Sequence, residues 1–230
     1  MATITREDLE QIGLLVGPSI RTFAGIANPQ VCIDSRSLTG GEIFFALKGE
    51  KTDGHTYVQA AFEKGAALAV VSKEWFAEKK VANTISPFID NLLFVVSDPL
   101  KALQQLATVY RQKYVFPIIG IAGSNGKTTT KEMSAAVLGK AFQTVATAGN
   151  FNNHIGVPLT LFRLRDETEI AVVEMGINHH GEMSELCSIA EPTHGLITNI
   201  GHEHLEFLRS PKDVAKAEGE LFSYLAQTDG

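Results

Sequence analysis

A glycine-rich turn between an apolar run and a helical pattern constrains this chain more than any other feature. Residues 120–130 read Gly-Ile-Ala-Gly-Ser-Asn-Gly-Lys-Thr-Thr-Thr and follow the apolar run 116–121. The helical pattern that comes next has apolar residues on one side at Met133, Val137, Leu138 and Ala141. Backbone N–H groups of such a loop can surround a phosphate chain, and the helix N-terminus adds positive potential. The stretch therefore predicts a strand, a phosphate-binding loop and a helix.

The loop departs from the general phosphate-loop pattern. The pattern G-x-x-x-x-G-K-[ST] needs its first glycine at position 121, where this chain has Ile121. The alternative is a tight strand-to-helix turn that carries a surface lysine. The strand–loop–helix context favours a nucleoside triphosphate, with Lys127 near the β- and γ-phosphates and the Thr128 hydroxyl offered to Mg²⁺. The predicted ATP-binding residues are Gly123, Ser124, Asn125, Gly126, Lys127, Thr128 and Thr129.

Composition narrows the class of protein. The chain has 230 residues, enough for one large or two small domains, and a formal net charge of −6. The sequence has no long basic run, which argues against nucleic-acid binding by charge, and its apolar runs are too short for a membrane span. Cys32 and Cys187 form no Cys-x-x-Cys pair, so we expect two buried thiols in a reducing compartment. The sequence shows no signal-peptide pattern, so a cytoplasmic location is expected. We also expect a monomer, although the sequence does not determine the oligomeric state.

The pattern divides the chain near Asp98–Pro99. Residues 1–98 predict a small parallel α/β domain. Its expected elements are a capped helix at 5–15, strands at 31–33, 43–47, 68–71 and 93–96, and a helix at 57–64. Residues 99–230 predict a parallel sheet with crossing helices. Its expected elements besides the loop are a helix at 99–111, strands at 144–147, 170–173 and 196–200, and a helix at 210–226 with Ser210 as its N-terminal cap. So few strands after the loop indicate an incomplete domain.

Ionisable side chains follow two of these strands at their carboxyl ends, where parallel sheets collect ligands. Glu174 ends the run 170–173, and a carboxylate there can bind Mg²⁺ or lie in solvent. His202 and His204 follow the strand at 196–200. Either can be a loop histidine without a role, and His204 can also bind a metal or orient a phosphate.

The last helix has a carboxylate on its apolar side. At ~100° per residue, Glu218 falls inside an apolar arc and Lys216 falls opposite. The arc consists of Val214, Ala217, Leu221 and Leu225. A lone inward carboxylate is costly unless it is paired or bound to a metal. Glu218 therefore either meets a cation or lies at the edge of the buried face.

Two further groups of polar residues are candidates for binding a ligand. Asn150, Asn152 and Asn153 crowd the stretch 147–158, where they could bind a polar ligand or form an ordinary turn. In the first domain, the polar candidates are Ser35, Arg36, Asp53 and His55. Arg36 and Ser35 suit a diphosphate or a carboxylate, although each could also serve a cap or a salt bridge.

Taken together, these segments resemble the Mur ligases of bacterial peptidoglycan synthesis over almost the whole chain. In the first domain the motifs are Asp34-Ser35-Arg36, Gly41–Gly49, Asp53-Gly54-His55 and Gly65-Ala66. In the second they are Gly149–Pro158, Glu174–Asn178, Gly181-Glu182, Thr198–Gly201 and His204-Leu205-Glu206. The second set resembles the members that add D-alanyl-D-alanine, whereas the first is shared with the members that add the third residue. The glycine spacing of the loop is normal for this family.

The resemblance implies an ATP-dependent amide ligase. Its first domain would bind UDP-N-acetylmuramoyl-tripeptide through Ser35, Arg36, Asp53 and His55, and the asparagine loop would meet substrate. ATP would bind at the loop with Mg²⁺ near Thr128, Glu174 and His204, and Lys127, Glu174 and His204 would be catalytic. ATP would phosphorylate the peptide carboxylate, and the amine of D-alanyl-D-alanine would displace the phosphate.

Two departures from the family pattern qualify this expectation. Family members carry a carbamoylated lysine in a Lys-x-Lys-Gly-Glu pattern, and this chain reads Lys216-Ala217-Glu218-Gly219-Glu220. We hypothesise that the Glu218 carboxylate serves as the metal ligand instead. The family also has more of the ATP domain and a third domain, so we expect this chain to bind the UDP-linked substrate without completing ligation. The alternatives are the ligase that adds the third residue and a nucleotide-sugar-binding module without catalysis.

Overall fold

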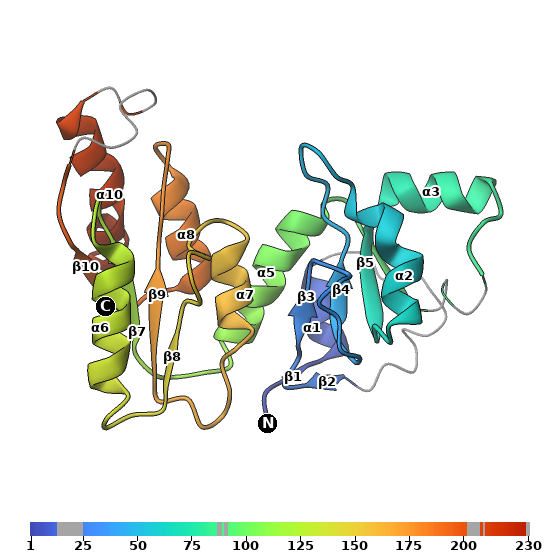
Figure 1. The fold of residues 1–230 in the computed structure, drawn as a ribbon, viewed down its shortest axis with the longest axis horizontal. Coiled ribbons are helices and arrows are strands. Elements are labelled where there is room, and N and C mark those ends of the chain that lie inside the picture. Colours follow the sequence, from blue (N-terminus) through green and yellow to red (C-terminus); the bar gives the residue numbers. More distant parts are fainter. Residues whose placement is uncertain (13–24, 87–88, 90–91, 202–207, 209, 229–230) are drawn as a thin grey trace. The chain divides into compact units, whose positions relative to one another are not determined.

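The computed structural model describes residues 1–12, 25–86, 89, 92–201, 208 and 210–228 (Figure 1). The chain divides into two compact units, Met1–Leu106 and Ala107–Gly230. This division falls within helix α5 (Pro99–Arg111). Each unit contains a four-stranded parallel sheet with helices, which confirms the predicted α/β fold class. The assignment of residues 1–98 and 99–230 to two functional domains stays a prediction.

The first unit is built on a sheet with strands in chain order. The strands are β3 (Val31–Cys32), β4 (Ile43–Phe45), β5 (Leu68–Ser72) and β6 (Leu93–Val96), all parallel. The helical segments are η2 (Gly54–Tyr57), α2 (Val58–Glu63) and α3 (Lys73–Val81). β4 and β6 are buried along their whole length, which explains why they appear in the sequence as continuous apolar runs rather than alternating ones.

A two-stranded antiparallel sheet and a short helix precede this sheet. Strand β1 (Thr3–Ile4) pairs with β2 (Ile26–Ala27), and α1 (Arg6–Ile12) follows β1. The Thr5 backbone N–H donates to Asp8 Oδ2 at 2.7 Å, and the Asp8 backbone N–H donates to Thr5 Oγ1 at 3.3 Å. This reciprocal pair satisfies two N–H groups at the helix start, as the capping pattern predicted. The part of the predicted helix beyond residue 12 lies outside the described residues.

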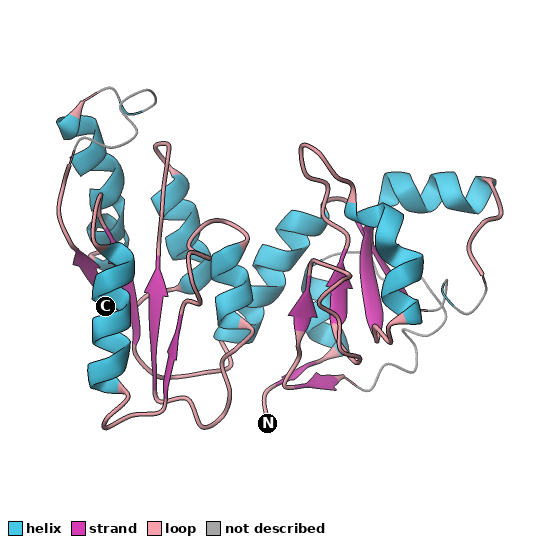
Figure 2. Cartoon of the chain, in the orientation of Figure 1, coloured by secondary structure: helices cyan, strands magenta, loops and turns pink. Residues whose placement is uncertain are grey.

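The second unit has a sheet whose strand order places the loop at its centre. The strands are β7 (Ile118–Ala122), β8 (Thr144–Ala146), β9 (Ile170–Glu174) and β10 (His194–Ile197), in the spatial order β10-β7-β9-β8 (Figure 2). All three neighbouring pairs are parallel. β10 joins β7 on the side away from β9 and β8, so the strand order reverses at β7. Open parallel sheets bind ligands at the carboxyl ends of strands beside such a reversal.

Four helices of the second unit accompany this sheet in the described residues. They are α6 (Lys127–Leu138), α7 (Gly156–Leu161), α8 (Glu182–Ala190) and α10 (Pro211–Leu225). At the start of α10, Ser210 Oγ accepts the Asp213 backbone N–H at 3.2 Å, which confirms the predicted cap. Strand β10 begins at His194 and ends at Ile197, earlier than the predicted 196–200.

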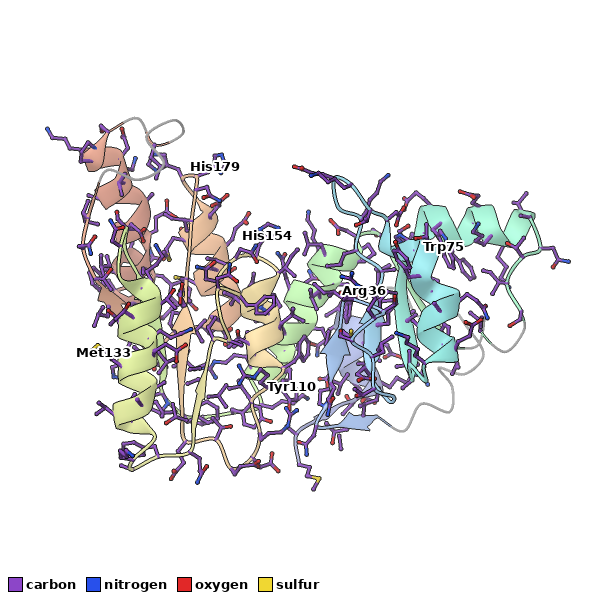
Figure 3. The ribbon with its side chains drawn as sticks, in the orientation of Figure 1. Arg36, Trp75, Tyr110, Met133, His154 and His179 are labelled. Carbon is purple, nitrogen blue, oxygen red and sulfur yellow. The ribbon has the colours of Figure 1, made fainter. Side chains whose placement is uncertain are left out.

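The apolar side predicted for the helix after the loop is wrong. Met133 and Val137 on α6 are 65% and 71% exposed, and Figure 3 shows Met133 pointing away from the sheet. The loop fixes the rotation of the helix, because Lys127 must face it, and Lys131 follows one turn later on the same face. Met133 and Val137 then fall on the opposite face, while Ala141 lies beyond the helix end and is exposed.

Two predictions from composition can be compared with the described residues. Cys32 and Cys187 are both buried and unpaired, as expected. Burial raises the pKa of the Cys187 thiol to about 12, so this thiol is a poor nucleophile at neutral pH. Within the described part of the chain, the helices are too short or too polar to cross a lipid bilayer.

Candidate functional site

Strand register brings the candidate residues of the second unit together at one edge of the sheet. Glu174 at the end of β9 pairs with Ile121 of β7, and Ile197 at the end of β10 pairs with Ala122. The loop 123–126 therefore leaves β7 between these two strand ends. The four strands run parallel, so all of their carboxyl ends face this loop.

The loop depends on glycine at its first position. Gly123 has φ +114°, which residues with a side chain rarely adopt. A Cβ built there would lie 2.4 Å from Thr198 Oγ1 and 2.9 Å from the Asn199 carbonyl oxygen. Gly126 also has a positive φ, +81°, and caps α6. The irregular glycine spacing in the sequence is thus required by the conformation of the loop.

The end of β10 holds the loop backbone in place. Thr198 Oγ1 donates to the Asn125 carbonyl at 2.6 Å, and Asn199 Nδ2 donates to the same oxygen at 2.8 Å. In return, the Asn125 backbone N–H donates to Asn199 Oδ1 at 3.1 Å. The Ser124 backbone N–H also donates to the Asn199 carbonyl at 3.0 Å. Sequence reasoning quoted Thr198 and Asn199 only within a family motif and missed them as site residues, because it placed both inside a strand predicted at 196–200.

Lys127 and Thr128 contribute the charge and the hydroxyl that the motif predicted. Lys127 Nζ donates to the carbonyls of Gly123 and Ser124, at 2.9 Å for Ser124. Its ammonium group therefore lies across the loop. Thr128 Oγ1 donates to Glu174 Oε1 at 3.1 Å, which joins the start of α6 to the end of β9. Asn125, Gly126 and Thr129 are exposed around this contact.

Glu174 is a buried carboxylate rather than a strand-end group in solvent. It is 1% exposed, and Oε1 accepts hydrogen bonds from Thr128 Oγ1 at 3.1 Å and Asn152 Nδ2 at 2.8 Å. Its other oxygen, Oε2, has no hydrogen-bond partner among the described residues. A buried carboxylate oxygen without a donor is costly, so this atom is poised to meet a cation.

The structure brings one of the three candidate asparagines to this cluster. Asn152 reaches Glu174, and Gly176 permits the approach because a Cβ there would lie 2.9 Å from the Asn152 amide. Asn153 Oδ1 instead accepts the backbone N–H groups of Ile155 and Gly156, at 3.1 and 2.9 Å. Asn153 therefore organises the start of α7, and Asn150 is exposed. Their predicted contact with substrate stays a prediction.

Glu218 faces inward from α10, as the helical wheel predicted. It is 4% exposed, and its Oε2 accepts the Gly123 backbone N–H at 2.9 Å. Lys216 is exposed on the other side of the helix. A second buried carboxylate thus contacts the loop backbone. His202 and His204, the other candidates, lie outside the described residues.

The four candidates of the first unit line two pockets. Ser35 and Arg36 line a pocket of about 330 Å³ with Leu47 and Tyr57. Asp53 and His55 line another, of about 390 Å³, with Trp75. Figure 3 labels Arg36 and Trp75. The sequence grouped these four residues as one binding set, whereas the structure divides them into two pairs.

Electrostatics differ between these two pairs. Arg36 Nε and Nη2 donate to the Asp34 carboxylate at 2.9 and 2.7 Å, and these hydrogen bonds lower the pKa of Asp34 to about 2. In the other pair, burial opposes ionisation of Asp53, but hydrogen bonds from the His55 backbone and ring lower its pKa. His55 Nε2 accepts the Ser72 backbone N–H at 2.9 Å, so Nδ1 carries the proton and donates to Asp53. Both ring nitrogens of His55 are therefore occupied within the fold.

Comparison with known proteins gives consistent matches. The Mur ligase middle domain matches residues 121–229, and the Mur ligase family catalytic domain matches residues 30–111. The UDP-N-acetylmuramoyl-tripeptide–D-alanyl-D-alanine ligase of Bacillus subtilis is 43% identical over 210 residues. The ligase of the same name from Escherichia coli is 40% identical over 229 residues. These matches cover 88% and 99% of this chain but 44% and 47% of those enzymes.

Solved structures give the same result. MurF from Acinetobacter baumannii superposes with a TM-score of 0.80 at 31% identity, over 97% of this chain and 47% of that one. MurF ligase from Thermotoga maritima, solved in complex with ADP, gives a TM-score of 0.74 at 27% identity, over 86% and 43%. The chain thus spans somewhat less than half the length of the relatives it matches.

Substituting two glycines should have opposite effects on stability. Gly123→Ala should destabilise the chain by more than about 1 kcal/mol, because the added methyl group meets Thr198 and the backbone is held at positive φ. Gly219→Ala, within α10 and with nothing near its Cβ position, should stabilise by about 0.5–1 kcal/mol. Urea denaturation of both variants and of the unsubstituted chain measures these changes in the free energy of unfolding. Equal effects of the two substitutions would contradict the described loop conformation.

Proposed function

The chain belongs to the Mur ligase family, and we propose that it supplies the nucleotide-binding and UDP-substrate-binding parts of an ATP-dependent amide ligase. The reaction joins D-alanyl-D-alanine to UDP-N-acetylmuramoyl-tripeptide. The observation that carries the proposal is the convergence of the loop, Lys127, Thr128 and the buried Glu174 at the carboxyl edge of the sheet. The relatives named for this reaction at 43% and 40% identity support it over the ligase that adds the third residue.

The loop offers the chemistry that a nucleotide phosphate chain requires. Lys127 Nζ donates to the carbonyl oxygens of Gly123 and Ser124, and these neutral oxygens are weaker partners than phosphate oxygens. We infer that bound phosphates replace these carbonyl oxygens as the hydrogen-bond partners of the Lys127 ammonium group. The N-terminus of α6, which begins at Lys127, adds positive potential at the same place.

The residues present also fit a magnesium ion. The described residues contain no group of three or more His, Cys, Asp or Glu side chains that could hold a metal ion. Mg²⁺, however, usually takes one or two carboxylates, phosphate oxygens and water. Glu174 Oε2, without a hydrogen-bond partner, and the Thr128 hydroxyl provide such a partial set. We propose that they hold Mg²⁺ together with His204 and Glu218, and the ion would neutralise charge on the phosphates.

The chemistry requires two anions to approach each other. A carboxylate oxygen of the tripeptide would attack the γ-phosphorus of ATP, and ADP would leave. The amine of D-alanyl-D-alanine would then attack the carbonyl carbon, phosphate would leave and the amine would lose a proton. Lys127 and the N-terminus of α6 would lower the repulsion in the first step by balancing phosphate charge, which is the main electrostatic contribution such a site makes.

In the first unit, we propose that the Ser35–Arg36 pocket takes the charged part of the UDP-linked substrate. Arg36 is the exposed cation at this pocket, with its side chain 88% exposed. Its planar guanidinium can bind a diphosphate through two parallel hydrogen bonds. The Asp53–His55 pair shapes the neighbouring pocket, where Trp75 offers an aromatic surface.

Nucleotide binding should depend on Lys127. Lys127→Met should weaken ADP binding at least about tenfold, since a hydrogen bond to a charged group contributes about 1.5–3 kcal/mol. Isothermal titration calorimetry with ADP and MgCl₂ measures the affinity. Lys140→Met removes an exposed lysine just beyond α6 and should leave binding unchanged. Equal affinities of the two variants would refute the role of Lys127.

Substrate binding should depend on the pocket of the first unit. UDP-N-acetylmuramoyl-tripeptide should bind to the chain with a calorimetric signal, and Arg36→Ala should weaken it at least about tenfold, because a bidentate charged contact is lost. Arg6→Ala, which removes an exposed arginine of α1, is the matched control. Binding that survives Arg36→Ala would place the diphosphate elsewhere.

The role of Glu218 can be tested through its charge. Glu218→Gln keeps an oxygen for the Gly123 N–H but removes the negative charge, so the Mg²⁺ concentration needed for half-maximal ADP binding should rise at least about threefold. Glu167→Gln, an exposed residue of the same unit, should not change it. An unchanged Mg²⁺ requirement in Glu218→Gln would show that Glu218 serves the loop alone.

A further inference from the structure

A lysine in α6 is buried without any role in the proposed chemistry. Lys131 lies one turn after Lys127, and its side chain is 0% exposed. Lysine is almost never fully buried unless its charge is paired, because removing an ammonium group from water is costly. A buried lysine beside a phosphate-binding loop therefore needs a physical reason.

The ammonium group of Lys131 joins three parts of the site. Nζ donates to the Gly149 carbonyl at 3.0 Å and contacts Glu132 Oε1 at 2.8 Å. It lies 3.8 Å from Glu174 Oε2. Glu132 is 64% exposed, so water screens its electrostatic attraction to Lys131. The buried partner of Lys131 is Glu174, at 1% exposed.

The distance to Glu174 determines what Lys131 can do. At 3.8 Å the two groups attract each other, but this is too long for a hydrogen bond. Glu174 Oε2 accordingly has no hydrogen-bond donor among the described residues. Lys131 thus balances the charge of the carboxylate while leaving the lone pairs of Oε2 available to a metal ion.

The contact with Gly149 adds a second effect. Gly149 lies in the loop that carries Asn152, and Asn152 Nδ2 donates to Glu174 Oε1 at 2.8 Å. Lys131 therefore holds the loop whose amide orients one carboxylate oxygen, and its charge stabilises the other. The side chain acts on Glu174 by two routes, through space and through residues 149–152.

We propose that Lys131 is a positioning residue for Glu174: it keeps this carboxylate buried, charged and aimed for a divalent cation at the phosphate site. The metal part of the proposal rests on the proposed function, whereas the pairing of Lys131 with Glu174 does not. Lys131 itself contacts no phosphate or metal in this role. Sequence reasoning missed it because a helical pattern treats a lysine as a solvent-facing residue.

A double-mutant cycle without any ligand tests the pairing. Lys131→Met should lower the melting temperature by about 5–10 °C, because it leaves a buried carboxylate without its counter-charge. Adding Glu174→Gln should recover at least about half of that loss, since the double variant has no buried charge left unpaired. If Lys131→Met does not fold alone, folding of the double variant supports the pairing. Losses that simply add, or a double variant that also fails to fold, overturn it.

A second measurement separates positioning from a merely structural role. ADP affinity is measured by calorimetry with and without MgCl₂ in the wild-type chain, Lys131→Met and the control Lys140→Met. In Lys131→Met, affinity without Mg²⁺ should stay within about twofold, while the gain that Mg²⁺ provides should fall at least about fivefold, because the oriented carboxylate is lost.

The two proposals fail in different ways. An Mg²⁺ gain that Lys131→Met retains in full overturns the positioning role. If the wild-type chain binds no ADP at all, the proposed nucleotide site fails, while a coupled melting-temperature cycle still supports the Lys131–Glu174 pairing. Glu132→Gln, which removes only the exposed partner of Lys131, should leave both the melting temperature and the Mg²⁺ gain close to wild type.

Discussion

The buried charge of Glu174 is the constraint on which the arrangement of the site depends. A carboxylate that is 1% exposed requires donors and a counter-charge, and the fold supplies them from helix α6 and from the loop after β8. Thr128 comes from the start of α6, Asn152 from the loop after β8, and Lys131 from one turn further along α6. Each of these segments is held in place by its contact with Glu174. These contacts leave Glu174 Oε2 without a donor among the described residues, so this side chain both stabilises the fold and is available for the proposed cation.

The conformation of the loop backbone depends on a second set of contacts. Its conformation is set by Gly123 at positive φ and by the hydrogen bonds that Asn125 exchanges with Thr198 and Asn199. These bonds use the carbonyl oxygen and the N–H group of Asn125, and together with the bonds from the Gly123 and Ser124 N–H groups they fix the path of the chain. Parallel strand order makes this possible, because β10 ends beside β7 and delivers Thr198 to the loop.

Much of this could be predicted from the sequence, and the exceptions have a common cause. Apolar runs located the strands, and local hydrogen-bonding patterns located the starts of α1 and α10 at Thr5 and Ser210. The helical wheel placed Glu218 inward because α10 has one continuous apolar arc. It failed for α6, where Lys127 and Lys131 face the site and Met133 and Val137 face outward. In α6, the loop determines which face of the helix turns toward the sheet. That face carries lysines, so the spacing of the apolar residues does not identify it.

The two buried carboxylates together argue for a cation in this site. Glu218 accepts the Gly123 N–H, and Glu174 lies at the end of the adjacent strand, so phosphates bound at the loop would approach both. The single buried counter-charge that the described residues place against Glu174 is Lys131, and Lys127 is proposed to serve the phosphates. Two carboxylates and a phosphate chain bound as proposed would carry more negative charge than two ammonium groups can balance. The proposed divalent cation would offset this excess, and the proposal therefore treats Glu174, Glu218 and Lys131 as one electrostatic unit.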